Sequence, residues 1–136
     1  MTFEEMKAIT NKATTRNKPR HVEDNIQIAC VRWFTLQYPE IAGLLHHSPN
    51  GGKRNAREAA RFKQMGVRPG FPDLILLKPS GGFHFLCIEL KTATGKQSEY
   101  QKEYQRLVES IGGKYVICRS FDDFRKEVIS YLFPKK

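Results

Sequence analysis

Three charged residues in the middle of the chain mark the ends of two apolar runs. Asp73 precedes the first run, Glu89 and Lys91 end the second, and a Pro-Ser-Gly-Gly turn at residues 79–82 separates the runs. Two apolar runs joined by such a turn are typical of a β-hairpin. A hairpin brings the start of one strand beside the end of the next, and alternate residues such as Glu89 and Lys91 leave the same face of a strand. We therefore expect these three side chains to lie together.

Two carboxylates beside an ammonium group suit one kind of chemistry. Oxygen ligands of this type hold a divalent cation such as Mg²⁺, and the lysine can orient a water molecule or offset charge on a phosphate. A Glu-x-Lys pair alone is better explained as a solvated salt bridge at the end of a hairpin. The complete arrangement, Pro72-Asp73 on one strand and Glu89-Leu90-Lys91 on the next, favours a metal-dependent phosphodiesterase site.

The length and charge of the chain limit the possible classes of function. Its 136 residues suffice for one domain with a proper core. Lys and Arg total 23 against 14 Asp and Glu, a formal net charge of +9, which favours a polyanionic partner, with nucleic acid first. No apolar run reaches the roughly 18 residues of a membrane span, and the N-terminus lacks an apolar leader core. We expect neither a membrane partner nor secretion.

The cysteines indicate a reducing compartment. Cys30, Cys87 and Cys118 are far apart in sequence, and each lies within an apolar run. An odd number of cysteines without a close pair is typical of buried, reduced thiols in a cytosolic protein. A zinc site built from these cysteines and a histidine is the less favoured alternative. We therefore expect a cytoplasmic protein.

Apolar periodicity and capping residues divide the rest of the chain into helices and strands. Asn55 and Ser98 each begin a capping-box pattern, and Pro39 ends the first helix. The strand–helix–strand order after the hairpin predicts that the last strand lies parallel to the Glu89 strand. The fold class is therefore α/β, with a mixed sheet flanked by helices in the core order α-β-β-β-α-β-α, to which a short helix at 55–65 is added between the first two strands. The expected helices are residues 21–38, 55–65, 98–111 and 120–132, and the expected strands are residues 44–47, 70–77, 83–91 and 115–118.

A basic segment precedes the hairpin. Residues 48–52 form a glycine-rich turn that leads into the expected helix at 55–65, and six basic residues stand between positions 53 and 68 against one acid, Glu58. Such a turn and helix suit a strand of phosphates, although a solvated basic face is the alternative. The candidate DNA-binding residues are Asn50, Gly51, Lys53, Arg54, Arg57, Arg61 and Lys63, together with Lys96 and Ser98 in the loop after the hairpin.

Three features outside the hairpin have two interpretations each. Glu23 lies near the start of the first helix, where an acid usually complements the helix dipole; the alternative is that it reaches the metal centre. His46 and His47 are adjacent, so in a strand they point to opposite faces and cannot readily chelate one ion together; the two interpretations are a residue that lines the site and a surface or structural residue, one for each histidine. Residues 1–20 are a polar, basic arm, either a disordered tail or a segment that lies on phosphates or on a partner subunit.

These residues resemble a known family. Pro72-Asp73 followed by Glu89-Leu90-Lys91 is similar to the core motif of the PD-(D/E)xK nuclease superfamily. More narrowly, the chain resembles the VRR-NUC (virus-type replication-repair nuclease) family, in its small standalone form common in phages and bacteria. The resemblance covers residues 21 to 132, so that an arm at 1–20 precedes a nuclease-like domain at 21–136. The other matching positions are Glu23, Gln27, residues 47–52, Arg54, Lys63, residues 66–73, Gly95, Lys96, Ser98 and Gln101.

The resemblance implies a restriction-endonuclease-like fold and a metal-dependent reaction. The expected cofactor is Mg²⁺, for which Mn²⁺ would substitute, and the reaction is hydrolysis of phosphodiester bonds in DNA. The family pattern implies that Asp73, Glu89 and the backbone carbonyl of Leu90 ligate the cation. Glu23 would join them as a ligand or through a water molecule.

The remaining catalytic residues and the substrate also follow from the resemblance. Lys91 would orient the attacking water and stabilise the transition state, and Gln101 would orient Lys91 or touch the DNA backbone. The standalone family members imply a homodimer that acts on branched DNA, in particular four-way (Holliday) junctions, without an organic cofactor. The alternatives are a catalytically silent DNA-binding module and a nuclease that cuts linear duplex or flap DNA. His46 departs from the family pattern and has no assigned role.

Overall fold

The computed structural model describes residues 19–49 and 55–135. The predicted N-terminal arm lies outside this part of the chain, except for its last two residues. Four of the candidate DNA-binding residues, Asn50, Gly51, Lys53 and Arg54, also lie outside it.

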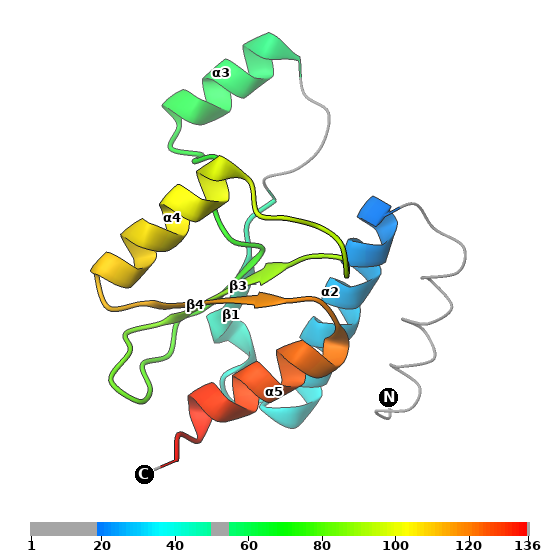
Figure 1. Ribbon diagram of the computed structural model, residues 1–136, viewed down its shortest axis with the longest axis vertical. Helices are drawn as coiled ribbons and strands as arrows, with labels where there is room; N and C mark the ends of the chain where they lie inside the picture. The colour runs from blue at the N-terminus through cyan, green and yellow to red at the C-terminus, as the bar shows by residue number, and fades with distance from the viewer. Residues whose placement is uncertain (1–18, 50–54, 136) are drawn as a thin grey trace.

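A four-stranded mixed sheet forms the centre of the molecule, with the strands in their chain order (Figure 1). The first two pairings are antiparallel and the third is parallel. In the register of the two central pairings, Leu74 lies opposite Ile88, and Glu89 lies beside Ile117. The strands are β1 (Leu45–His47), β2 (Leu74–Leu76), β3 (Leu86–Leu90) and β4 (Lys114–Cys118).

Helices cover both faces of the sheet (Figure 1). Helices α2 and α5 pack against one face and against each other, and α4 packs against the other. Helix α3 projects beyond the N-terminal end of α4 and buries none of its residues. The helices are α2 (Pro19–Gln37), α3 (Ala56–Gln64), α4 (Glu99–Ser110) and α5 (Phe121–Leu132), and a 3-10 turn, η1 (Ala42–Leu44), leads into β1.

The two faces have cores of different size. The face under α2 and α5 holds the larger apolar cluster, which includes the fully buried Phe34 and Phe124. The face under α4 holds a smaller one, formed by Cys87, Val108 and Tyr115 with partly buried neighbours. Because alternate residues of β3 point to opposite faces, Ile88 belongs to the larger core, whereas Glu89 points to the side of α4.

The predicted fold class is confirmed, including the parallel pairing of the last strand with the Glu89 strand. Asn55, Ser98 and Ser120 each accept a backbone N–H bond at the start of their helix. The two hairpin strands are shorter than the predicted 70–77 and 83–91, since β2 pairs with its neighbours over only three residues, whereas β4 begins one residue earlier than predicted.

Two smaller expectations have clear outcomes. The three cysteines are buried and free, as expected. In the described part of the chain, no helix is both long and apolar enough to cross a bilayer.

Candidate active site at the end of the central strands

Asp73 and Glu89 face each other across the first and second strands of the hairpin. The register that pairs Leu74 with Ile88 places Asp73, one residue earlier, opposite Glu89, one residue later. Asp73 is fixed there because its Oδ2 accepts a hydrogen bond of 2.7 Å from the backbone N–H of Leu90. The two carboxyl groups therefore converge at the end of the sheet that the sequence predicted.

Glu89 is buried, with 2% of its surface exposed. Its Oε2 accepts a hydrogen bond of 2.8 Å from the hydroxyl of Tyr115 on the neighbouring strand β4. Burial raises the pKa of Glu89 to about 9, and a hydrogen bond and charge repulsion from Asp73 add to this effect, while Tyr115 and Lys91 oppose it. A pKa in this range favours the protonated form of Glu89 at neutral pH when no cation is bound.

Glu23 and Lys91 complete the charged cluster. Burial raises the pKa of Glu23, the positive charge of Lys91 lowers it, and the charge of Asp73 raises it. The backbone of Thr92 also hydrogen-bonds the Glu23 side chain. Helix α2 thus brings Glu23 from the opposite side of the sheet to the end of β3, where it interacts with Lys91 and Asp73.

The loop after Lys91 is held in place by a residue that the sequence analysis did not single out. Arg119 Nη1 donates to the carbonyl oxygens of Thr92 at 2.7 Å and of Gly95 at 2.6 Å. The backbone N–H of Lys91 donates to Cys118 at the end of β4. These bonds tie the backbone at Lys91 and the loop after it to the end of β4 and to Arg119.

Two more contacts hold the other wall of the site. His47 Nδ1 lies 2.6 Å from the backbone oxygen of Asp73, so His47, and not His46, is the histidine beside the carboxylates. Gly70, at φ +82°, packs so closely on the start of α4 that a Cβ atom there would collide with the carbonyl of Tyr100. This contact fixes the segment that leads into Asp73.

A hydrogen-bonded network lies beneath Glu89 on the α4 side of the sheet. The side chain of Gln97 interacts with the Tyr115 hydroxyl, and Gln97 Nε2 donates to Gln105 Oε1 at 2.9 Å. Sequence analysis assigned Tyr115 to a buried strand without seeing this contact. The signal that could have found it is alternation, because Tyr115 pairs with Cys87 and therefore shares the face of Glu89.

Gln101 and Ser98 serve the cap of α4. The Ser98 side chain accepts from the backbone of Gln101, and Gln101 Oε1 accepts from the backbone N–H of Ser98 at 2.8 Å. The side-chain oxygen of Gln101 therefore accepts a hydrogen bond at the helix start. Its amide nitrogen is a donor, which suits a DNA backbone oxygen but not the Lys91 ammonium, because an ammonium accepts no hydrogen bond. Lys96 is exposed in the loop between Lys91 and α4.

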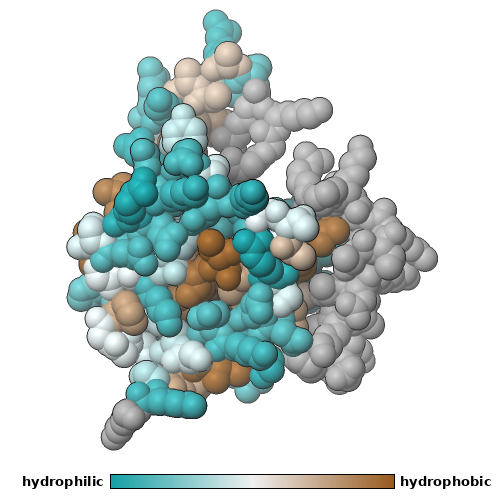
Figure 2. Space-filling model, in the orientation of Figure 1, coloured by the Kyte–Doolittle hydropathy of each residue, from teal (hydrophilic) through white to brown (hydrophobic). Residues whose placement is uncertain are grey.

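The basic residues of α3 lie apart from the carboxylate cluster. Arg57, Arg61 and Lys63 are exposed on the projecting helix. The surface formed by α3 and α4 is mainly hydrophilic in Figure 2. These three candidate DNA-binding residues therefore lie on α3, beyond the N-terminal end of α4.

The carboxylate pair fits a divalent cation that keeps much of its water. One oxygen of Asp73 and one of Glu89 are engaged by protein donors, and burial together with the neighbouring Asp73 disfavours an uncompensated negative charge on Glu89. Within the described ranges, no set of three or more His, Cys, Asp or Glu side chains is close enough to form a complete metal site. Mg²⁺ commonly binds through one or two carboxylates and several waters.

Two comparisons with known proteins gave matches. A model of the VRR-NUC domain family matches residues 21–122. A solved structure named "VRR_NUC domain protein" superposes with a TM-score of 0.71 and is 31% identical, over 80% of this chain and 86% of that one. A search of the curated proteins found no match.

Proposed function

This chain belongs to the VRR-NUC domain family, and from that premise we propose that it is a divalent-metal-dependent DNA endonuclease that hydrolyses phosphodiester bonds. The observation that carries the proposal is the buried Glu89 facing Asp73, with Lys91 on the same strand end. An apolar strand end gains nothing in stability from two facing carboxyl groups, one of them buried. A site for a cation and a phosphate accounts for them.

Each residue of the cluster has a distinct task in this reaction. Asp73, Glu89 and the backbone carbonyl of Leu90 would hold Mg²⁺ or Mn²⁺, and Glu23 would bind one of the coordinated waters. When bound, the cation lowers the pKa of a water molecule and offsets charge on the scissile phosphate. Lys91 orients the attacking water and stabilises the negative charge that develops on the phosphate oxygens.

Residues around the cluster hold it in position. Tyr115 donates its hydroxyl hydrogen to Glu89 and so favours the ionised carboxylate that a cation needs. Arg119 fixes the loop after Lys91 through two backbone carbonyls. Arg57, Arg61 and Lys96 are exposed cations that would bind neighbouring phosphates and set the DNA across the site. The products would be 5′-phosphate and 3′-hydroxyl ends.

The proposed substrate is branched DNA, with a four-way junction first. The site stands on one small domain, which offers little surface for reading base sequence. A homodimer would place two such sites around a two-fold axis and so match a symmetric junction by geometry. Recognition would then depend on DNA shape and backbone contacts.

One panel of DNA substrates tests this proposal. Labelled four-way junction, flap and linear duplex are incubated with wild type or Lys91→Ala, with Mg²⁺ and with EDTA. We expect wild type to cut the junction only with Mg²⁺, and Lys91→Ala to bind the junction without cutting it. A Lys91→Ala protein that cuts at the wild-type rate would refute the catalytic assignment. Binding without any metal-dependent product would favour a silent binding module, and equal cutting of linear duplex would refute junction selectivity.

A further inference from the structure

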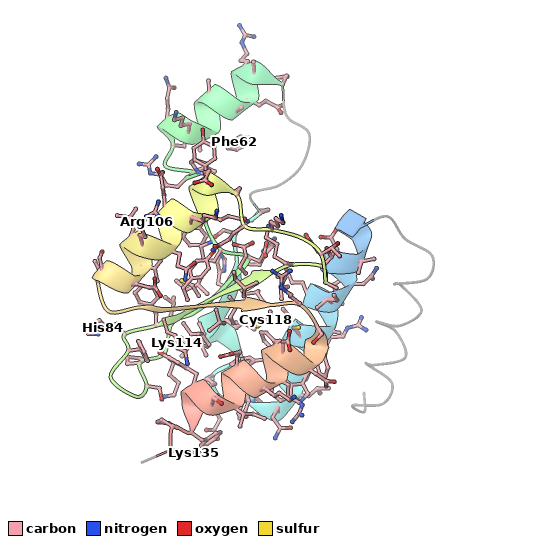
Figure 3. The ribbon with its side chains drawn as sticks, in the orientation of Figure 1. Phe62, His84, Arg106, Lys114, Cys118 and Lys135 are labelled. Atoms are coloured by element: carbon pink, nitrogen blue, oxygen red, sulfur yellow. The ribbon has the colours of Figure 1, made fainter. Side chains whose placement is uncertain are left out.

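A pocket lies between helices α3 and α4, beside the carboxylate cluster. It has a volume of about 570 Å³, within the usual range for sites that enclose small molecules or parts of larger ligands. Figure 3 shows Phe62 at the end of α3 that lies nearest to α4. The lining is mostly apolar and is formed by Ser48, Pro49, Phe62, Met65, Gly66, Val67, Arg68, Phe71 and Tyr104.

Three aromatic rings from three different segments line this pocket. Phe71 and Tyr104 contact each other with ring centroids 5.2 Å apart and planes inclined at 64°, and Phe62 comes from α3. All three rings are partly exposed, and all three line the pocket. Aromatic side chains around an open pocket suit a flat ring as ligand, because ring stacking adds to apolar burial.

The charge around the pocket favours an anionic ligand. Arg68 lines the pocket, and its Nη1 donates to the carbonyl oxygen of Lys63 at the C-terminal end of α3. Residues 55–68 hold four cations, Arg57, Arg61, Lys63 and Arg68, against the single acid Glu58. A flat apolar ring carried on an anionic backbone is the chemistry of a nucleotide.

The pocket also has a fixed relation to the carboxylate cluster. Phe71 precedes Asp73 by two residues, and Ser48 directly follows His47, whose ring contacts the backbone of Asp73. The close packing of Gly70 on the start of α4 holds Phe71 in place. A nucleotide bound here would therefore belong to the same DNA strand, or the same branch point, as the phosphate at the cluster.

We propose that the α3–α4 pocket binds one unstacked nucleobase of the DNA substrate, held by Phe62, Phe71 and Tyr104. The proposal rests on the proposed nuclease function and extends it, because it gives the domain a way to prefer DNA with unpaired or easily unstacked bases. A branch point or single-stranded segment offers such a base at low cost, whereas a continuous duplex must first be opened.

The test uses two oligonucleotides of equal charge. One is oligothymidine of about twelve nucleotides, and the other is the same backbone with abasic sites. Their affinities for wild type are measured by fluorescence anisotropy in EDTA. We expect wild type to bind oligothymidine roughly 5- to 150-fold more tightly, the range of one to a few base–aromatic contacts.

Variants assign the preference to the pocket. Phe62→Leu keeps an apolar side chain but removes the ring, and we expect it to lose most of the preference for oligothymidine while binding the abasic strand as wild type does. Phe83→Ala is the control, since Phe83 is an exposed ring near the turn between β2 and β3 and does not line the pocket. It should leave both affinities unchanged. Circular dichroism and thermal unfolding confirm that each variant is folded.

Three results would overturn the proposal, and two combinations of results separate its failure from that of the nuclease function. Equal binding of both oligonucleotides by wild type contradicts it, as does a Phe62→Leu protein that loses affinity for both equally. A Phe62→Leu protein that changes from dimer to monomer in light scattering shows that the pocket is a subunit interface. If wild type cuts junctions with Mg²⁺ but shows no base preference, only the pocket inference fails. If wild type neither binds nor cuts DNA, the proposed function fails, and the pocket inference that rests on it fails with it.

Discussion

The two faces of the central sheet differ in what they bury. The face under α2 and α5 buries a large apolar cluster, in which the Trp33 ring meets Phe121 and Phe124 edge-on at 6.1 Å. The face under α4 buries less apolar surface and carries a polar chain that runs from Glu89 through Tyr115 to Gln97. One strand, β3, supplies residues to both faces.

This difference shows how a small domain can stay folded although it buries a carboxyl group. Along β3, Ile88 and Leu90 point into the large core, while Cys87 and Glu89 point toward α4. Because side chains alternate, a shift of one residue in register would place the carboxyl in the large core and break the site. The apolar face therefore fixes the register on which the polar face depends.

The largest expected effect is on the apolar face. Phe124→Ala removes a fully buried ring that packs against Trp33 and should lower the free energy of unfolding by about 3–5 kcal/mol. Chemical denaturation followed by circular dichroism measures the loss. The rate of DNA cleavage per folded molecule should stay close to wild type, and a selective loss of catalysis would show that the faces are not separable in this way.

The next effect concerns the proton on the polar face. The folded protein holds a proton on Glu89 up to about pH 9, whereas a glutamate in an unfolded chain releases it near its ordinary pKa of about 4.3. Unfolding therefore releases a proton between these values, so the free energy of unfolding of the metal-free protein falls as pH rises. Between about pH 6 and pH 8 the fall should approach about 2–3 kcal/mol.

Glu89→Gln is the matched control for this pH dependence. The amide keeps the shape of the side chain but cannot titrate, so most of the slope should disappear in denaturation curves measured at several pH values in EDTA. Wild type and Glu89→Gln with the same slope would mean that other groups control the pH dependence.

A smaller effect is expected at Tyr115. Tyr115→Phe removes the 2.8 Å hydrogen bond to Glu89 and should cost about 1 kcal/mol of stability, the usual net value of such a bond. It should also raise the Mg²⁺ concentration needed for half-maximal cleavage, because the ionised carboxylate loses a donor. Tyr131→Phe is the control, because it also removes a tyrosine hydroxyl that donates a hydrogen bond, here to the carbonyl oxygen of Lys78. Tyr131 lies on α5, on the face of the sheet opposite Glu89, so this variant should show no change in Mg²⁺ requirement.

The smallest effects on the fold are expected on α3. Arg57→Ala and Arg61→Ala change exposed side chains, so each should alter stability by less than about 0.5 kcal/mol. Each should lower the magnitude of the slope of log affinity against log salt for junction DNA by about 1. Salt titrations of binding in EDTA measure this. An unchanged slope in both variants would place the phosphate contacts elsewhere.

Local signals were enough to predict most of the fold. The hairpin followed from two apolar runs and a glycine turn, and two of the helix starts followed from Asn55 and Ser98, whose side chains cap their helices. The convergence of Asp73 and Glu89 followed from hairpin geometry alone. Each of these inferences needs only neighbours in sequence or one short connection.

The remaining contacts depend on distant segments and could not be read from local patterns. The bond from Tyr115 to Glu89 requires the register of the parallel pair β3–β4. The Arg119 contacts require the end of β4 to lie beside the loop after Lys91. Gln101 was expected to orient Lys91 or touch the DNA backbone. Glutamine three residues after a serine also completes a capping box, and the Gln101 side-chain oxygen accepts from the backbone N–H of Ser98 in that cap.

The central claim is that the polar end of β3 is a metal-dependent site for phosphodiester hydrolysis. The most direct test is the single-turnover rate of junction cleavage in saturating Mg²⁺ by wild type and by Glu89→Gln, with folding of both proteins verified at the assay pH. We predict metal-dependent cleavage by wild type and a rate at least about 100-fold lower for Glu89→Gln. Cleavage by Glu89→Gln at the wild-type rate would contradict the claim.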